Sequence, residues 1–334
     1  MKNTIVDVAK AANVSVATVS RVINGNYPVK QETKETVLKV IEELNYTPNT
    51  QARDLIKQQS STIGVVVPSI SNMFFTDVVN GIESYFDNSK YSIFLCTTNH
   101  DKEKEITRVN ELMARNVAGI ILVDPNVENS KLNFFDNIAK NIPIVSVNGN
   151  INSQYISSVS NDEENGAKAA INHLIENNHN DILFIRGENS YSYDVKEKAY
   201  KEIMSEISNF KKEYIINIGQ GNGRETVNKT MEEGIKILSK NKEISAVFAC
   251  NDLMGIGIIN ACKKLKKKIP SELSVIGYDN IELSEMVEPK LSTVDQNMFL
   301  LGKNAGMLLS EKIENNNKYS KRTILNNKLI IRNT

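Results

Sequence analysis

The chain has 334 residues, in which 40 Lys and Arg balance 40 Asp and Glu. Hydrophobic residues make up 40 % and charged residues 24 %, which is typical of folded domains in water, and the length predicts two or three of them. The balance excludes a chain-wide polycation or an acidic disordered segment, but leaves room for a small nucleic-acid-binding module. No stretch approaches the roughly 18–20 apolar residues of a membrane span, and residues 1–10 lack the apolar segment of a secretory signal. We therefore expect a cytoplasmic protein without membrane contact.

The cysteines and histidines give no sign of a metal or redox site. Cys96, Cys250 and Cys262 lack the C-x-x-C spacing of such sites, and the three histidines form no cluster in the sequence. We expect buried, reduced thiols, and neither a metal nor a cofactor.

Residues 1–46 show the periodicity of three short helices. Apolar residues recur at helical spacing from Ile5 to Ala12, from Val19 to Ile23 and within Glu32–Leu44. Ser15 precedes the second stretch, where its hydroxyl can cap an early backbone N–H. The pattern predicts a small all-α helix-turn-helix domain, followed by a polar linker over residues 47–61.

From Thr62 onwards, β-branched runs alternate with amphipathic stretches. The predicted strands are Ile63–Val67, Ser92–Cys96, Gly119–Val123, Ile144–Val147, Ile182–Ile185, Tyr214–Ile218, Ala246–Ala249 and Ser274–Gly277, with a strand-like stretch over Thr323–Arg332. The predicted helices are Phe74–Asn88, Lys102–Asn116, Ser130–Asn141, Glu164–Asn177, Val195–Ile207, Glu225–Ser239 and Asp252–Lys266. This alternation indicates right-handed βαβ units and two similar subdomains, each built on a parallel sheet.

The second predicted helix has an outward face suited to reading DNA. In a helix-turn-helix unit the N-terminal residues of the second helix approach base edges in the major groove. Arg21 can donate to both O6 and N7 of a guanine, and Val16 and Ala17 suit thymine methyl groups. Ser20 lies on the same face, and Thr18 can contact a phosphate. Periodicity alone leaves open a helical hairpin without a DNA function.

Several ordered motifs closely resemble those of the lactose-repressor (LacI/GalR) family. They are Ile5-Val6-Asp7-Val8-Ala9, the run from Val14 to Asn24, Leu44–Asn49 and Ala52-Arg53-Asp54-Leu55. The resemblance implies a helix-turn-helix head over 1–46 and a hinge linker with a hinge helix over 47–61. It also implies a periplasmic-binding-protein-like α/β core of two parallel-sheet subdomains. The N-terminal subdomain would span 62–161 and 291–320, and the C-terminal subdomain 162–290 and 321–334.

The same resemblance implies further DNA contacts. A hinge helix over Gln51–Ile56 would enter the minor groove, with Leu55 wedged into a base step and Ala52 permitting close approach. The DNA backbone would be contacted by Thr4, Thr18, Asn24, Asn49 and Arg53. Asp54 departs from the small neutral residue expected at its position. Base-reading residues would be Val16, Ala17, Ser20 and Arg21.

Polar and aromatic residues follow the ends of several predicted strands, where ligands of such sheets bind. The expected effector-binding residues are Asn72, Phe74, Phe75, Asn148, Lys196, Asn251 and Asp279. Asp279 matches the effector-binding acid of the family's I-G-Y-D-N signature, and Asn251 its N-D pair. Lys196 stands where many members have an arginine, and a lysine cannot supply a bidentate grip.

These observations predict a transcriptional repressor of carbohydrate metabolism that binds a pseudo-palindromic operator as a homodimer. A small-molecule effector, a sugar or a sugar phosphate, would control it by changing the angle between the subdomains. One alternative is the catabolite control protein branch, whose co-repressor is phosphorylated HPr. Leu283–Val287 resembles the partner-contact region of that branch, but Glu288 would repel a phosphate. A further alternative is a cytosolic sugar-binding protein that does not bind DNA. No motif of a hydrolase, a P-loop enzyme or a zinc protease is present, so we expect no catalytic residues and no enzyme.

Overall fold

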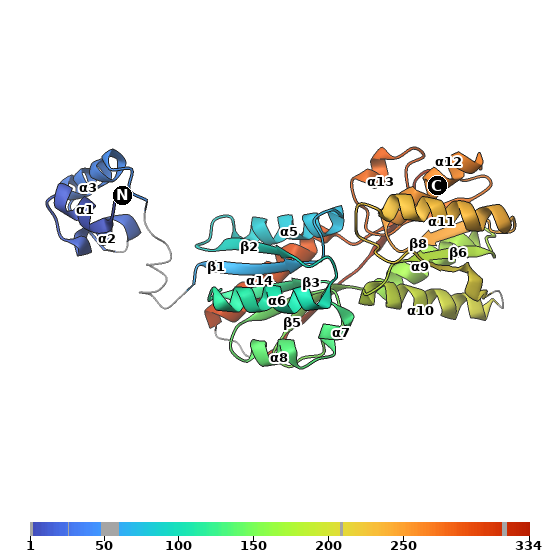
Figure 1. Cartoon of the computed structure of the whole chain (residues 1–334), viewed down its shortest axis with the longest axis horizontal. Helices are drawn as coiled ribbons and strands as arrows, with labels where there is room; N and C mark the ends of the chain where they lie inside the picture. Colours follow the sequence, from blue (N-terminus) through green and yellow to red (C-terminus); the bar gives the residue numbers. More distant parts are fainter. Residues whose placement is uncertain (1–2, 26, 48–59, 208–209, 316–318) are drawn as a thin grey trace. The chain divides into compact units, whose positions relative to one another are not determined.

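The computed structural model of the chain describes residues 3–25, 27–47, 60–207, 210–315 and 319–334. The chain divides into two compact units, residues 1–60 and 61–334, which are described separately. The sequence colouring of Figure 1 distinguishes the head from the two lobes of the larger unit. Among the described residues, no helix is long and apolar enough to cross a membrane.

The described part of the head forms α1 (Ile5–Ala11), α2 (Val16–Asn24) and α3 (Gln31–Glu43). A capping box between Thr4 and Asp7 starts α1, and the Ser15 hydroxyl accepts a hydrogen bond from the Thr18 N–H at 3.1 Å to start α2. Gly25 ends α2 in the left-handed conformation, which glycine adopts without steric cost. The small core consists of Val8, Ala9, Ala12, Val19, Val22, Val37 and Val40.

The first lobe is built on a six-stranded sheet in the order β11-β5-β4-β3-β1-β2, all pairs parallel. Its strands are β1 (Thr62–Val67), β2 (Ser92–Thr97), β3 (Gly119–Val123), β4 (Ile144–Val147), β5 (Ser157–Asn161) and β11 (Arg322–Leu325). Its helices are α5 (Met73–Phe86), α6 (Lys102–Ala114), α7 (Val127–Ser130), α8 (Phe134–Ala139) and α14 (Met298–Asn315). α5 and α14 pack on one face of the sheet, and α6 and α8 on the other (Figure 1).

Two glycines allow α5 and α14 to approach closely. A Cβ on Gly302 would lie 1.9 Å from the carbonyl oxygen of Val78, and one on Gly81 would lie 2.1 Å from that of Phe299. Only glycine avoids these backbone clashes. The contact fixes the position of α5, whose first residues line the pocket described below.

The second lobe has a four-stranded parallel sheet in the order β7-β6-β8-β9. Its strands are β6 (Ile182–Arg186), β7 (Ile215–Asn217), β8 (Ala246–Ala249) and β9 (Ser274–Ile276). Its helices are α9 (Glu163–Glu176), α10 (Tyr191–Glu206), the short 3-10 helix Lys212–Tyr214, α11 (Thr226–Lys240), α12 (Asp252–Leu265) and α13 (Leu283–Met286). One large core joins the sheet to α9, α10, the 3-10 helix, α11 and α12.

The chain passes between the lobes three times. It leaves the first lobe after β5, returns through β10 (Thr293–Asp295), and crosses again around β12 (Lys328–Ile330). β10 and β12 pair antiparallel and form a small sheet of their own. These crossings make the two lobes interleaved in sequence.

The predicted fold class is confirmed, but four features differ from the sequence prediction. The sequence analysis assigned residues 321–334 to the second lobe, but β11 pairs with β5, so 322–325 belong to the sheet of the first lobe. The predicted helix over 130–141 is two short helices, α7 and α8, because the chain turns at residues 131–133 before α8 begins. The sequence analysis also missed β5 and α14. β5 has the polar sequence Ser-Ser-Val-Ser-Asn, yet it is half to fully buried between β4 and β11.

Candidate functional site

α2 presents the expected reading face outward. Val16 is 41 % exposed, Ala17 and Arg21 are exposed and Ser20 is half-buried, whereas Val19 on the opposite side is fully buried. The burial pattern follows from helical periodicity, because residues three and four apart share a face. The structure therefore brings these base-reading candidates together on one accessible surface.

The expected backbone contacts of the head are partly occupied within the head itself. The Thr4 hydroxyl donates to Asp7 at 2.7 Å, and this hydrogen bond lowers the pKa of the Asp7 carboxyl. The Thr18 hydroxyl is 2.9 Å from that of Ser15, and the Asn24 amide donates to the Ser20 carbonyl oxygen at 2.7 Å. Asn49, Ala52, Arg53 and Leu55 lie outside the described residues.

Tyr27 is a residue of the head that the sequence analysis missed. Its ring is 66 % exposed, and the guanidinium carbon of Arg21 lies 5.5 Å from the ring centroid. A cation over an aromatic face is attracted to it, so Tyr27 restricts the freedom of the Arg21 tip. An exposed aromatic just after a candidate reading helix is the signal that could have identified it.

The seven expected effector residues all line one pocket between the lobes, with an empty volume of about 310 Å³ that opens to solvent. They are Asn72, Phe74, Phe75, Asn148, Lys196, Asn251 and Asp279. The sequence analysis missed the other lining residues, Asp124, Ser190, Ser192, Tyr193, Asn222, Cys250 and Gln296.

Strand ends account for much of this convergence. Asp124, Asn148 and Asn251 come one or two residues after β3, β4 and β8, and the carboxyl ends of parallel strands meet at one edge of a sheet. Asp124 could therefore have been found by the rule that identified Asn148. Gln296 follows β10 in a crossing segment, a place that strand periodicity does not reveal.

Hydrogen bonds across the pocket join the two lobes. The Asn72 amide donates to Asn222 Oδ1 at 2.7 Å, and the Ser190 hydroxyl donates to Asp124 Oδ1 at 3.1 Å. Asn222 Nδ2 also lies 3.0 Å from His100 Nε2. Burial lowers the pKa of His100 to about 4, so its ring is neutral near pH 7 and can accept this bond. These contacts tie the two lobes together at the pocket.

Lys196 is buried in the pocket wall, with 1 % of its surface exposed. Its ammonium donates to the Ser192 hydroxyl at 2.8 Å and to the Cys250 carbonyl oxygen at 3.2 Å. It also lies 3.7 Å from the centroid of the Tyr278 ring. The cation is thus held by a hydroxyl, a carbonyl and an aromatic face of its own chain.

Burial makes ionisation of the two carboxyl groups in the pocket unfavourable. Burial raises the pKa of Asp124 to about 7, and the nearby charge of Glu163 adds to this effect. Burial also raises the pKa of Asp279 well above its usual range, although Lys196 and the 2.6 Å hydrogen bond from Gln296 oppose it. Both groups hold protons more tightly than exposed carboxyls do.

Asn251 and Asn148 have structural bonds as well as a place in the pocket. Asn251 Oδ1 accepts from the Met254 N–H at 2.9 Å and caps α12, while its amide donates to the Gly221 carbonyl oxygen at 2.8 Å. Asn148 Oδ1 accepts from the Asn161 N–H at 3.3 Å. Both side chains are therefore preorganised by the backbone around them.

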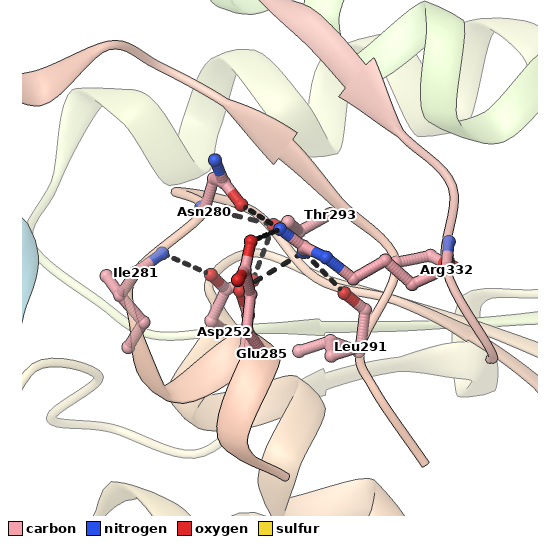
Figure 2. A network of polar contacts seen from close by, with 9 residues as sticks. Asp252, Asn280, Ile281, Glu285, Leu291, Thr293 and Arg332 are labelled. Atoms are coloured by element: carbon pink, nitrogen blue, oxygen red, sulfur yellow. Dashed lines mark hydrogen bonds and ion pairs between the residues drawn. The ribbon is translucent and has the colours of Figure 1, made fainter. Parts of the chain in front are cut away.

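A polar network beside the pocket fixes the loop that carries Asp279. Figure 2 shows the Arg332 side chain reaching Asn280, Glu285 and Leu291. Its guanidinium donates to Asn280 Oδ1 at 2.7 Å, to the Leu291 carbonyl oxygen at 2.8 Å and to Glu285 at 2.8 Å.

Asp252 anchors the other side of this network (Figure 2). Its carboxylate accepts from the Ile281 N–H at 2.9 Å and from the Thr293 hydroxyl at 2.5 Å. Burial raises the pKa of Asp252 to about 7, against these hydrogen bonds and the charge of Arg332. Asn280, next to Asp279, is therefore held from two directions.

Replacing Arg332 by alanine is expected to destabilise the 61–334 unit by about 3 kcal/mol, because buried acceptors lose charge-assisted donors. Urea denaturation followed by far-ultraviolet circular dichroism measures the change. Arg322→Ala is the control, since that arginine is exposed on β11 and should change stability by no more than about 0.5 kcal/mol. Equal effects of the two substitutions would remove the structural role assigned to Arg332.

Comparison with known proteins identifies the family of this chain. Residues 4–49 match the model for bacterial regulatory proteins of the lacI family, and residues 171–334 match a periplasmic binding protein-like domain. The chain is 35 % identical to catabolite control protein A of Priestia megaterium over 315 residues, or 93 % of this chain and 92 % of that protein. The chain belongs to the lacI family of bacterial regulatory proteins. Like its family, it is a DNA-binding transcriptional repressor with an effector domain.

Further lacI-family relatives cover nearly the whole chain. The HTH-type transcriptional repressor PurR of Vibrio vulnificus (strain CMCP6) is 34 % identical over 334 residues, 99 % of this chain and 98 % of that protein. A solved periplasmic binding protein/LacI transcriptional regulator from Alkaliphilus metalliredigens QYMF, complexed with D-xylulofuranose, is 32 % identical with a TM-score of 0.70, and the match covers 82 % of this chain and 99 % of that one. The lac repressor dimer bound to operator and the anti-inducer ONPF shares the fold, with a TM-score of 0.84 at 24 % identity over 100 % of this chain and 99 % of that one. The named relatives are regulators rather than enzymes.

Proposed function

We propose that this lacI-family repressor binds a pseudo-palindromic operator as a cytoplasmic homodimer, with no catalytic activity and no cofactor. Val16, Ala17, Ser20 and Arg21 read bases in the major groove. The observation that carries this proposal is the exposed face of α2, on which these side chains gather beside a buried valine core. Dimer symmetry doubles a contact surface that is small in one head.

The remaining DNA contacts are proposed from the family pattern. Ala52 and Leu55 enter the minor groove, and Asn49 and Arg53 contact phosphates. Phosphate oxygens accept hydrogen bonds, so Thr4 and Asn24, whose side-chain donors are already bonded within the head, contact the DNA backbone through neighbouring backbone N–H groups. The Thr18 hydroxyl can donate to a phosphate while it accepts from the Ser15 hydroxyl.

The pocket between the lobes is the proposed effector site, and the genes under control belong to carbohydrate metabolism. Its amides, carboxylates and hydroxyls suit a ligand with several hydroxyl groups, and Phe74 and Phe75 offer apolar faces. The relative from Alkaliphilus metalliredigens was solved with a furanose sugar, which supports this assignment. An effector switches the protein only if it binds one arrangement of the lobes more tightly than the other.

A protein co-repressor is the second candidate for the controlling partner. The 35 % identity to catabolite control protein A favours phosphorylated HPr, since proteins of that name work with this partner. Met286 on α13 is 65 % exposed and Leu283 is also exposed. Glu288, however, places an acid where a phosphoserine would need a cation.

Selection from random duplex DNA with the full-length protein tests the proposed function. We expect a two-fold symmetric consensus, and nanomolar binding to it by fluorescence anisotropy. Titration of that complex with phosphorylated HPr, in parallel with unphosphorylated HPr, tests the second candidate. A pool that shows no consensus would refute the DNA-reading assignment and leave a sugar-binding protein.

A further inference from the structure

The charged groups around the pocket are unequal in number. Of the described residues that line it, Asp124 and Asp279 carry carboxyl groups, and Lys196 is the single cation. All three are more than nine-tenths buried. Glu163 is equally buried, neither of its carboxylate oxygens has a hydrogen-bond partner, and its charge acts on both aspartates. The pocket therefore has an excess of acidic groups.

The one cation is not available to an incoming anion. A lysine ammonium has three N–H donors, and that of Lys196 already bonds Ser192 and Cys250 and lies against the face of Tyr278. A ligand phosphate could reach this ammonium only by displacing those partners. No arginine is among the described residues that line the pocket, so no bidentate phosphate grip exists there.

Asp124 is the acid with the least compensation. Asp279 is stabilised by the nearby charge of Lys196 and accepts a hydrogen bond from the Gln296 amide at 2.6 Å. Asp124 accepts a hydrogen bond at 3.1 Å from the Ser190 hydroxyl, which is neutral. Its raised pKa, which results first from burial and then from Glu163, reflects that deficit. A positively charged ligand group next to Asp124 would compensate the charge of its carboxylate.

We propose that the pocket selects its ligand by charge: it takes an unphosphorylated polyol, binds the amine-substituted polyol more tightly and rejects the phosphate ester, with Asp124 setting this preference. The inference rests on the proposed effector role of the pocket. A phosphate dianion buried beside the Asp124 carboxylate, which is largely ionised at pH 7.5, is repelled in a medium that screens charge weakly. An ammonium in place of a hydroxyl gains a charge-assisted hydrogen bond to the carboxylate.

Isothermal titration calorimetry on the full-length protein at pH 7.5 tests the proposal. The ligands are matched sets: glucose, glucosamine and glucose 6-phosphate; the corresponding galactose and mannose sets; and fructose, 1-amino-1-deoxyfructose and fructose 1-phosphate. In the set that fits the pocket, the amine should bind at least about tenfold more tightly than its parent, and the phosphate at least about tenfold more weakly.

Asp124→Asn isolates the residue. Asparagine retains an oxygen that can accept from Ser190, but it removes the charge, so both ratios should shrink to within about threefold. Asp87→Asn, an exposed acid on the same lobe, should leave both ratios unchanged. Thermal unfolding confirms that each variant is folded before titration.

Three outcomes would overturn the proposal. They are a phosphate ester that binds as tightly as its parent, a panel in which no amine binds more tightly than its parent, and unchanged ratios in Asp124→Asn. The same preparations are assayed for operator binding by anisotropy. Intact operator binding with a failed ligand test refutes the charge selection alone, whereas loss of specific DNA binding refutes the proposed function.

Discussion

Replacing Arg21 by alanine is expected to weaken operator binding of the dimer by about 2–6 kcal/mol. One bidentate arginine–guanine pair contributes about 1–3 kcal/mol of discrimination, and a symmetric dimer carries the pair twice. Arg21 is exposed on α2, and Tyr27 restricts its tip, so less side-chain freedom is lost on binding. Fluorescence anisotropy with the selected operator measures the affinity.

The consensus selected by Arg21→Ala should lose its preference at one symmetric position in each half-site. Lys39→Ala is the matched control, because Lys39 is an exposed cation on α3 that is paired with Glu43 at 3.8 Å and is not part of α2. It should leave the consensus unaltered and the affinity within a few tenths of a kcal/mol. An unchanged consensus for Arg21→Ala would show that another residue reads that position.

Replacing Asp124 by asparagine is expected to stabilise the 61–334 unit at pH 8. Burial raises the pKa of Asp124 from 3.8 to about 7, so the folded state binds this proton more tightly than the unfolded state. The native protein therefore loses stability as pH rises from about 4 through 7, by up to about 4 kcal/mol for this group. Asparagine does not ionise and escapes that loss.

The pH dependence separates this effect from a simple change in packing. The advantage of Asp124→Asn should roughly halve at pH 5, where much less of the loss has occurred. Urea denaturation at the two pH values gives the difference, and exposed Asp87→Asn should show little change at either. If the variant is less stable than the parent at pH 8, the folded protein stabilises the charge of the Asp124 carboxylate, and the predicted cost of its ionisation is wrong.

Much of the pocket was predictable because parallel strands place their ends at one edge. Asn148, Asn251 and Asp279 were found by that rule, together with a family signature, and they do line one pocket. Ser190 and Asn222 were not found, because they contact the first lobe through hydrogen bonds between residues far apart in the sequence. Local periodicity contains no information about such contacts.

The assignment of the last strand was wrong for a related reason. β11 alternates between exposed and half-buried residues, as an edge strand of either sheet would. The sheet that β11 joins depends on the crossing between the lobes that precedes this strand. Its partner β5 lies more than 150 residues earlier in the sequence. α2, by contrast, depends on Ser15, Gly25 and its own apolar face, so its limits could be predicted closely.

The three crossings between the lobes also determine the order in which the molecule can be completed during synthesis. The first lobe begins at β1, but its sheet lacks an edge strand until β11 has been made, and all strands of the second lobe's four-stranded sheet are translated in between. A nascent chain that has reached residue 290 therefore contains the strands of that sheet, while β5 is still unpaired on one side. Such an edge is a template for pairing with other chains. Premature termination near residue 320 should consequently cause aggregation, whereas loss of the head alone should leave the 61–334 unit soluble.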